Sequence, residues 1–389
     1  MDHSQHKATL CVHGGTDKSL LTEGVNTPVF NSSAISFMDY EEILYPRNFN
    51  TINQRVVADK VCALEMAEAG LVFGSGMAAI SNTILSLLKN GDHILFQRDL
   101  YGGTYQMAVK MLPQFGISYS FADATPEAMS EAIRPETKMI YVETPSNPLL
   151  RITDLEMVAS LAKSHGLLTM IDNTFASPIN QNPIPLGIDI VMHSGSKYLG
   201  GHSDLLFGVT VSTKEIMDRV KMGGKIFGSN VNASTASLIE RSIKTLAVRM
   251  RQHNENAQLL AEYLQQHNQV REVYYPGLPQ CQGHALASRQ MHGFSGMLSF
   301  EPKLKGMSQA EQMLRKLKFI SPAVSLGGVE TLINLPARTS HSLLPAEDRA
   351  KVGVSDVLMR VSVGIEEIND IISDLDQALD QAKVYAMHN

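Results

Sequence analysis

The chain has 389 residues, of which 44% are hydrophobic and 19% are charged, and its formal net charge is −6. This length predicts two domains, and the composition is ordinary for a globular protein. The acidic balance and the scattered basic residues give no reason to expect binding to nucleic acid or to an anionic membrane.

The cysteines and the N-terminal segment indicate the compartment. Cys11, Cys62 and Cys281 lie far apart and show no paired spacing, which argues against a zinc site or a disulfide framework. The first fourteen residues are polar and lack the apolar core of a secretory signal, and no apolar run has the length of a membrane span. We therefore expect a cytoplasmic protein.

Residues 1–55 are rich in Asn, Ser, Thr and Pro without a sustained period, which predicts an irregular arm. From residue 56, helix-like segments alternate with short apolar runs, and such runs are typical of strands buried on both faces. The alternation predicts an α/β domain over residues 56–245 with a mostly parallel sheet. The seven runs are Leu71–Phe73, Ile94–Phe96, Ile117–Phe121, Met139–Val142, Leu168–Ile171, Ile188–Met192 and Leu206–Val211.

The remaining chain, residues 246–389, predicts a smaller α+β domain. One long helix is expected over 234–267, followed by strand-like 297–300, helix-like 308–317 and strand-like 358–363. The last segment predicts a helix, because its apolar residues fall on one face at a spacing of 3.6. These residues are Ile368, Ile371, Ile372, Leu375 and Leu379.

Ligands of α/β sheets collect at the carboxyl ends of strands, so the residues after each run are candidates. Gly74-Ser75-Gly76-Met77 follows the first run and leads into a helix, whose free amide groups could bind phosphate. With Ala79 it also fits part of a dinucleotide fingerprint, but the next strand ends at Gln97 where that motif has an acidic residue. A simple tight turn is the alternative.

Three further strand ends carry candidate side chains. Tyr101 follows the second run and could stack on a flat cofactor, although a lone tyrosine is more often part of the core. Asn147 lies in a loop held by two prolines, where it could equally serve its own turn. Asp172 ends an apolar run and needs a partner if buried, either as a helix N-cap or beside a cationic ring nitrogen.

The sixth run is followed by Ser194-Gly195-Ser196-Lys197. Serine hydroxyls can bind phosphate oxygens, and a desolvated lysine readily forms a Schiff base. His193 and His202 lack carboxylate partners in the pattern, so no metal is expected. One ligand, pyridoxal 5′-phosphate (PLP), has a phosphate for Gly76, Met77, Ser194 and Ser196, a ring for Tyr101, a ring nitrogen for Asp172 and an aldehyde for Lys197.

The same residues resemble the Cys/Met-metabolism family of PLP enzymes, which includes cystathionine γ-synthase, the cystathionine lyases, methionine γ-lyase and the homoserine sulfhydrylases. The likeness runs from about residue 16 to 381. The segments that carry it are Ser75–Ile80, Tyr101–Thr104, Glu143–Pro148, Asp172–Phe175, Ser194–His202, Ser325–Gly328 and Arg360–Gly364.

The resemblance implies the fold of type I PLP-dependent transferases, with a large seven-stranded sheet domain, a smaller C-terminal domain, and tetramers built from dimers. It implies that Tyr45 and Arg47 match a Tyr-x-Arg motif of the N-terminal arm, which reaches the phosphate of the neighbouring subunit. It also implies cofactor contacts by Asn147 and substrate contacts by Arg360, Ser325 and Tyr45, with Arg360 on the α-carboxylate.

The implied catalytic residues are Lys197, Asp172 and Tyr101. Lys197 removes the Cα proton, Asp172 keeps the ring nitrogen protonated, and Tyr101 stacks on the ring and protonates the departing sulfur. The expected reaction is β- or γ-elimination on methionine, homocysteine or cystathionine, which yields an α-keto acid, ammonia and a thiol. The alternatives are a γ-replacement transferase and, from a different class, an inactive scaffold. A nicotinamide oxidoreductase would leave Lys197 unused.

The chain departs from the family pattern at several positions. Asn50-Thr51-Ile52-Asn53 stands where an Asn-Pro-Thr motif is common. Leu44 and Val324 replace glutamates of cystathionine-handling members, which favours methionine or homocysteine. Gly103, in contrast, replaces a cysteine that is common in methionine γ-lyases.

Overall fold

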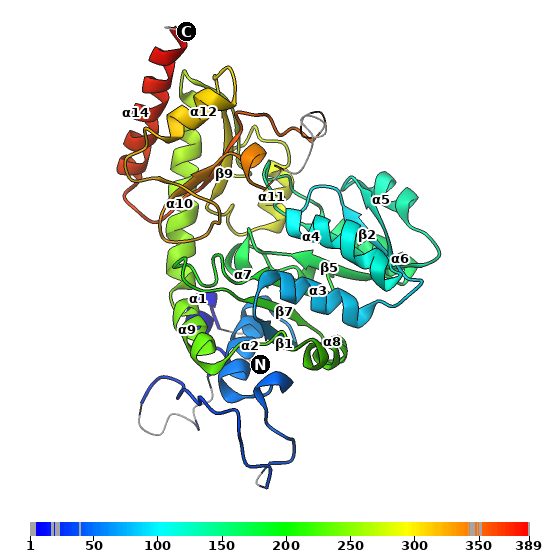
Figure 1. Cartoon of the computed structure of the whole chain (residues 1–389). Helices are drawn as coiled ribbons and strands as arrows, with labels where there is room; N and C mark the ends of the chain where they lie inside the picture. Colours follow the sequence, from blue (N-terminus) through cyan, green and yellow to red (C-terminus); the bar gives the residue numbers. More distant parts are fainter. Residues whose placement is uncertain are drawn as a thin grey trace.

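The computed structural model describes residues 5–16, 19, 24–38, 40–340, 342, 347, 349 and 352–387, with side chains described as far as residue 382 (Figure 1). Its strands form two sheets. Among the described residues, no helix combines the length and the apolar character that crossing a membrane requires.

The first sheet has seven strands in the order β1-β7-β6-β5-β4-β2-β3. Only β7 runs antiparallel to its neighbours, β1 and β6, so the predicted mostly parallel sheet is confirmed. Each of the seven apolar runs contributes to one strand. The strands are β1 Ala69–Phe73, β2 His93–Gln97, β3 Ser118–Ala122, β4 Thr137–Glu143, β5 Leu168–Asp172, β6 Ile190–Ser194 and β7 Gly208–Ser212.

Helices cover both faces of this sheet, which explains why its strands are apolar without alternation. Along β4, Ile140 and Val142 pack into one core with α2 Ile52–Glu65, α6 Leu155–His165 and α9 Ala233–Ile243. Met139 and Tyr141 point to the opposite core, which is shared with α3 Gly76–Leu87 and α8 Lys214–Phe227. Successive residues of one strand therefore stabilise two separate layers.

The second sheet has the order β10-β11-β12-β9-β8 and carries its own hydrophobic core. The long helix α10 Leu246–Gln266 runs along this part of the molecule, as Figure 1 shows, and α12 Met307–Leu314 and α14 Ile368–Met387 pack with it. The sheet comprises β8 Val270–Tyr274, β9 Met297–Pro302, β10 Ser321–Pro322, β11 Leu332–Asn334 and β12 Met359–Ser362.

Two expectations about helices differ from the structure in part. The helical stretch expected over 234–267 is present but consists of two helices, α9 and α10, between which Thr245 leaves helical geometry with φ −102° and ψ 3°. The N-terminal arm is not wholly irregular, since it contains a short helix, α1 Lys7–His13. The other short helices are η2 Pro46–Asn48, α4 Gly102–Gln106, η3 Met107–Met111, η4 Leu112–Phe115, α5 Pro126–Ala132, α7 Ser177–Asn180, η5 Ile184–Leu186, α11 His284–Gln290 and η6 Pro336–Arg338.

Candidate active site

Lys197 lies in the tight loop that follows β6. The amide groups of Lys197 and Gly200 donate to the carbonyls of Ser194 and Gly195, at N···O distances of 3.2 and 2.8 Å. Only glycine fits at position 195, because a Cβ there would lie 2.1 Å from the ring of Phe207. The loop therefore projects Lys197 from the carboxyl end of the sheet in a fixed direction.

The Lys197 ammonium group is largely removed from water. Its Nζ donates to Ser325 Oγ at 2.8 Å. Burial and, to a smaller extent, the cation of Arg360 lower the pKa of Lys197 to about 8, against the opposing effect of the Asp172 carboxylate. A lysine in this setting loses its proton far more readily than a lysine in water.

Arg360 of β12 lies in the same cluster and is 6% exposed. Its two terminal nitrogens donate to Asn147 Oδ1 at 2.9 Å and to the carbonyl of Ser325 at 3.1 Å. In the described part of the chain, its Nε is buried without a hydrogen-bond partner. Burial lowers the pKa of Arg360 to about 10. A buried guanidinium held by neutral oxygens, with one donor left over, is suited to a bound carboxylate.

Asp172 ends β5 and is 6% exposed. Its Oδ1 accepts hydrogen bonds from the amide and the hydroxyl of Thr174, and the amide bond measures 3.0 Å. The Thr174 hydroxyl also accepts from the amide of Ser194 at 2.8 Å. Burial raises the pKa of the Asp172 carboxyl above its ordinary value although these donors oppose the shift. The charge of Lys197 also opposes the shift without cancelling it, so a further cation beside this carboxyl would stabilise its charged form.

Glu143, at the end of β4, is the direct neighbour of Asp172 in the sheet. Burial and the charge of Asp172 raise the pKa of the Glu143 carboxyl well above its ordinary value. Its Oε2 accepts the backbone N–H of Tyr101 at 2.7 Å. Glu143 therefore fixes the start of α4, from which the half-exposed ring of Tyr101 extends.

The turn after β1 forms a cradle against the end of β6. A Cβ added to Gly76 would lie 2.7 Å from Ser194 Cβ and 2.8 Å from its hydroxyl, so only glycine permits this approach. Ser75 caps α3 by accepting the amide of Ala78 at 3.0 Å. The uncapped amides at the start of α3 and the Ser194 hydroxyl form a donor set suited to an anion.

Met77 and Tyr101 lie together over Gly103. A Cβ on Gly103 would be 2.5 Å from the Tyr101 ring and 2.8 Å from Met77 Sδ.

Ser196, which was expected to bind the phosphate, has hydrogen bonds within the chain. Its hydroxyl accepts the amide of Phe207 at 2.9 Å and donates to the Phe207 carbonyl at 3.2 Å. The structure thus uses Ser196 to close the lysine loop.

Tyr45 and Arg47 stand apart from this cluster. Arg47 donates to the carbonyl of Lys225 at 2.6 Å and its guanidinium lies 5.8 Å from the centre of the Tyr45 ring. Tyr45 is 41% exposed. Within one chain, no described contact joins either residue to Lys197, Asp172 or Arg360.

Sequence reasoning did not select Glu143, Thr174 and Glu65 as site residues. Glu143 and Thr174 flank predicted strand ends, and that position is the signal that could have identified them. Glu65 is fully buried and lies 2.6 Å from His193, with Glu65 Oε1 facing His193 Nε2. In the described ranges no group of three or more His, Cys, Asp or Glu could hold a metal ion.

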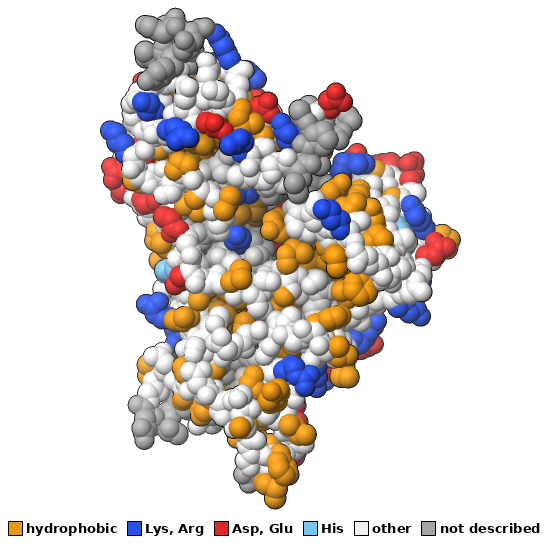
Figure 2. Space-filling model, viewed as in Figure 1, with side chains coloured by type: hydrophobic (Ala, Val, Ile, Leu, Met, Phe, Trp, Pro, Cys, Tyr) orange, Lys and Arg blue, Asp and Glu red, His pale blue; other side chains and the backbone are white. Residues whose placement is uncertain are grey.

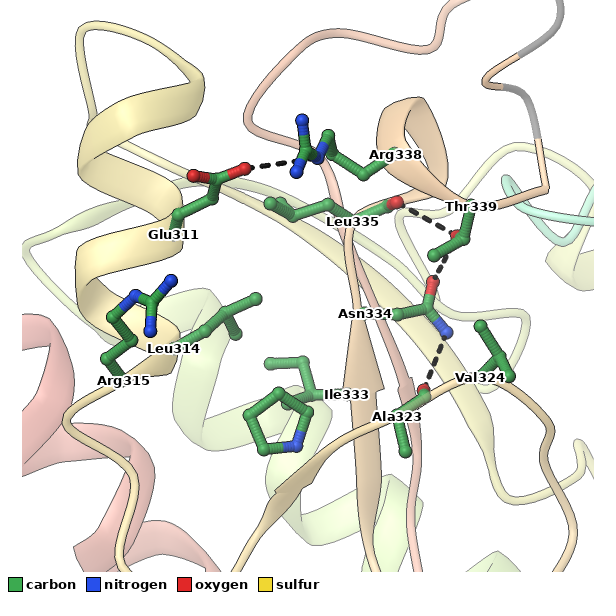
Figure 3. A pocket seen from close by; sticks show the side chains of 11 residues that line it. Glu311, Leu314, Arg315, Ala323, Val324, Ile333, Asn334, Leu335, Arg338 and Thr339 are labelled. Atoms are coloured by element: carbon green, nitrogen blue, oxygen red, sulfur yellow. Dashed lines mark hydrogen bonds and ion pairs between the residues drawn. The ribbon is translucent and has the colours of Figure 1, made fainter.

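A cavity of about 440 Å³ lies beside this cluster, between α12 and the strand edge of β10 and β11 (Figure 3). Val324, the residue before Ser325, lines it, and Figure 3 shows the ion pair between Arg338 and Glu311 at its rim, with an N···O distance of 3.1 Å. Asn334 reaches from β11 toward the carbonyl of Ala323. Ala323 and Val324, which directly precede Ser325 in the chain, thus belong to the wall of the cavity.

Comparisons with known proteins agree with this geometry. The profile of the family described as "Cys/Met metabolism PLP-dependent enzyme" matches residues 8–380. The chain is 40% identical to a cystathionine beta-lyase from Lactococcus lactis subsp. cremoris, over 96% of this chain and 98% of the relative. It is 42% identical to a cystathionine gamma-lyase from Bacillus subtilis, over 96% and 99%.

Two further matches extend the comparison. An L-methionine gamma-lyase from Fusobacterium nucleatum is 38% identical over 96% of this chain and 98% of the relative. The crystal structure of cystathionine gamma-lyase from Lactobacillus plantarum complexed with L-serine superposes with a TM-score of 0.92 at 38% identity, covering 97% of this chain and 100% of that one.

Proposed function

This chain belongs to the Cys/Met metabolism family of PLP-dependent enzymes, and from that premise we propose that Lys197 is the centre of its active site. It is a PLP-dependent carbon–sulfur lyase of the trans-sulfuration type that acts on sulfur amino acids. The observation that supports this site best is the Lys197 ammonium, buried with a lowered pKa between Ser325 and Arg360.

The residues present fit PLP. The cradle of Gly76, Met77 and Ser194 would hold its phosphate, and the buried carboxyl of Asp172 would hold the protonated ring nitrogen. Tyr101 would cover the ring, and Lys197 would bond the aldehyde. When bound, PLP supplies a carbonyl carbon that bonds an amine and a ring that accepts an electron pair from Cα.

The chain's own residues then have separate roles in the reaction. Arg360 binds the substrate carboxylate through its terminal nitrogens, which Asn147 and the Ser325 carbonyl orient. Lys197 takes the Cα proton, because the Arg360 cation and burial keep a useful fraction of its amine neutral near pH 7 to 8. Ser325 Oγ, 2.8 Å from Nζ, fixes the direction of that amine.

Tyr101 is the proposed acid for the leaving sulfur. Glu143 holds its backbone at 2.7 Å, while its half-exposed ring remains free to face a substrate. Elimination then converts a sulfur amino acid and water into an α-keto acid, ammonia and a thiol.

Product analysis tests this function. Purified protein with PLP would be given methionine, homocysteine, cystathionine and an acylated homoserine, each with and without an added thiol. Equal yields of keto acid, ammonia and thiol from a sulfur amino acid are expected, and Lys197→Ala should abolish them. Thioether formation without ammonia would instead identify a γ-replacement transferase. Borohydride should attach the cofactor to the peptide that contains Lys197, and a label elsewhere would refute the site.

For the substrate, we propose a preference for an apolar leaving group, as in methionine or homocysteine. Leu44 is buried and apolar, and Val324 is 66% exposed beside Ser325. Neither side chain can bind the distal ammonium of cystathionine. The charged pair Arg338 and Glu311 lies at the rim of the adjoining cavity, where Val324 contributes to the wall.

We further propose that the N-terminal arm completes the site of a second subunit in a tetramer built from two dimers. The N-terminal arm forms the lowest projection in Figure 1, and apolar side chains gather on that projection in Figure 2. Val25, Phe37, Met38 and Ile43 are 69–83% exposed. Apolar clusters of this kind mark contact surfaces.

Mixing two inactive variants tests the shared site. Arg47→Ala and Lys197→Ala would each be purified, mixed, and allowed to exchange subunits. If Arg47 serves the neighbour, some hybrid sites contain both natural residues and activity returns. Mixtures that stay inactive although hybrids form would contradict the proposal, and sedimentation would show whether dimers or tetramers are present.

The cytoplasm is the location we propose. Cys11, Cys62 and Cys281 are all free thiols, the state that a reducing compartment maintains. Cell fractionation with an antibody against the chain would test it.

A further inference from the structure

Glu65, the last residue of α2, is a buried carboxylate directly beneath the site. Its exposed fraction is 0%. Oε1 accepts from Asn173 Nδ2 at 2.8 Å and lies 2.6 Å from His193 Nε2, and Oε2 accepts from Asn182 Nδ2 at 3.1 Å. Burying a carboxylate is costly unless donors surround it, and here both oxygens have donors.

The partners of Glu65 are the immediate neighbours of two proposed cofactor ligands. Asn173 follows Asp172 at the end of β5, and His193 precedes Ser194 at the end of β6. We propose that Glu65 is a positioning residue that fixes the carboxyl of Asp172 relative to the phosphate cradle at Ser194. A single oxygen atom, Oε1, joins the two strand ends.

The sheet itself does not hold these ends together. The pairing of β5 with β6 stops at Asp172 and Met192, and the last backbone bond runs from the Asn173 amide to the Met192 carbonyl at 2.9 Å. Beyond that point, side chains connect the ends of the two strands. The Thr174 hydroxyl accepts a hydrogen bond from the Ser194 amide. Glu65 Oε1 contacts both Asn173 and His193.

The side chains that bind Glu65 form further hydrogen bonds with their own neighbours. Gln181 Nε2 donates to Asn173 Oδ1 at 2.9 Å and to the Thr144 carbonyl at 3.1 Å. The Lys7 ammonium contacts Asn182 Oδ1 and the Pro178 carbonyl. A buried polar network whose members all have partners is rigid, so it can transmit the position of α2 to the site.

Glu65 also fixes the proton of His193. With a carboxylate oxygen 2.6 Å from Nε2, that nitrogen carries the hydrogen. Burial raises the pKa of the nearby Asp172 carboxyl, and the electrostatic interaction with His193 is among those that oppose this rise and favour the charged form needed beside a ring nitrogen. The carboxylate of Glu65 thus influences both the place and the charge of Asp172.

The inference rests on the proposed function, because it concerns how PLP is held. Glu65→Gln tests it: the amide keeps the size of the side chain but turns one acceptor into a donor that faces a donor. The matched control is Glu240→Gln. Glu240 is also a buried glutamate, 5% exposed, but its partners are Thr27 at 3.2 Å and Lys244 at 3.7 Å, away from the site.

Loss of PLP from diluted holoenzyme would be followed by its visible absorbance, with circular dichroism of the bound cofactor as a second signal. We expect Glu65→Gln to hold PLP about tenfold more weakly and with altered dichroism, as the loss of a hydrogen bond to a charged group implies. Glu240→Gln should stay within about twofold of the parent protein.

A Glu65→Gln protein that melts lower but retains PLP and dichroism like the control would overturn the positioning role. If that variant does not fold, Asn173→Ala gives the second test, because it removes the β5 connection, together with the hydrogen bonds to Gln181, and leaves Glu65 with His193. Unchanged retention there would equally reject the inference. Parent protein that binds no PLP would refute the proposed function itself, so the two failures are distinguishable.

Discussion

The positive charge of Lys197 destabilises the protein when PLP is absent, and we predict that Lys197→Met makes the PLP-free protein more stable near pH 7. The ammonium has one neutral partner, Ser325 Oγ at 2.8 Å, and it faces the cation of Arg360. Its pKa falls from 10.5 to about 8 as a result. Methionine has a similar length and carries no charge.

The size of the effect follows from that pKa. The difference between 10.5 and 8 is 2.5, which at 1.36 kcal/mol for each pKa unit gives about 3 kcal/mol when lysine is protonated in both states. Losing the Ser325 hydrogen bond offsets roughly 1 kcal/mol of this. The remaining gain of about 2 kcal/mol corresponds to a rise in melting temperature of roughly 2–3 °C for a chain of this length.

The pH dependence gives the sharper test. Between pH 8 and 10.5 the unfolded lysine still holds a proton that the folded one has lost, so the stability of the parent protein rises with pH across this window. The advantage of the variant should therefore shrink from pH 8 upward and vanish at roughly pH 9.5 to 10, where the remaining charge penalty equals the roughly 1 kcal/mol of the lost hydrogen bond. Calorimetry at pH 7 to 10 measures it, with Lys138→Met at an exposed position of β4 as control. No gain at pH 7, or a gain that does not change with pH, would refute the reasoning.

Three further changes concern the loaded enzyme. Asp172→Ala should retain PLP by absorbance yet lose turnover by about 100-fold or more, because the buried charge at the ring nitrogen is gone, and full activity would contradict that role. Arg360→Lys should raise KM for the amino acid about 10- to 100-fold, because ammonium cannot reproduce the guanidinium fork held by Asn147, and an unchanged KM would place the carboxylate elsewhere. Val324→Glu should raise kcat/KM for cystathionine relative to methionine by roughly tenfold, since a carboxylate would then face the distal ammonium. An unchanged ratio would show that residue 324 does not face the leaving group.

Much of the first sheet could be predicted because burial on both faces makes its strands continuous apolar runs. Ile140 and Val142 on one side and Met139 and Tyr141 on the other leave no polar residue between positions 139 and 142 of β4. The break between α9 and α10 could not be predicted, because Thr245 stands there without glycine or proline to mark it.

The candidate site was predictable in part for a geometric reason. Asp172, Ser194 and Lys197 follow neighbouring parallel strands, whose carboxyl ends meet at one edge of the sheet. Arg360 and Ser325 belong to the other sheet, and only the family resemblance pointed to them. The hydrogen bonds of Ser196 with Phe207 could not be predicted, because a hydroxyl beside a lysine gives no indication of such a partner.

Glu65 could not be predicted to lie near the site, for a different reason. Eleven of the fourteen residues of α2 are buried, among them Lys60 as well as Glu65. A helix covered on nearly all sides shows no polar face, so periodicity cannot tell an inward carboxylate from an outward one. Likewise His193 carried no partner in its local sequence, since Glu65 lies 128 positions away.

The two sheets together create the reactivity of Lys197. The first sheet supplies the lysine and the carboxylate of Asp172, which raises the pKa of Lys197. The second supplies the Arg360 cation, which lowers it, and Ser325, which accepts from its amine. The Arg360 guanidinium meets Asn147 of the first sheet's β4–α6 loop at 2.9 Å, so substrate carboxylate and catalytic amine are positioned by the same contact between the sheets. A shift of the second sheet would therefore weaken substrate binding and raise the pKa of the base together.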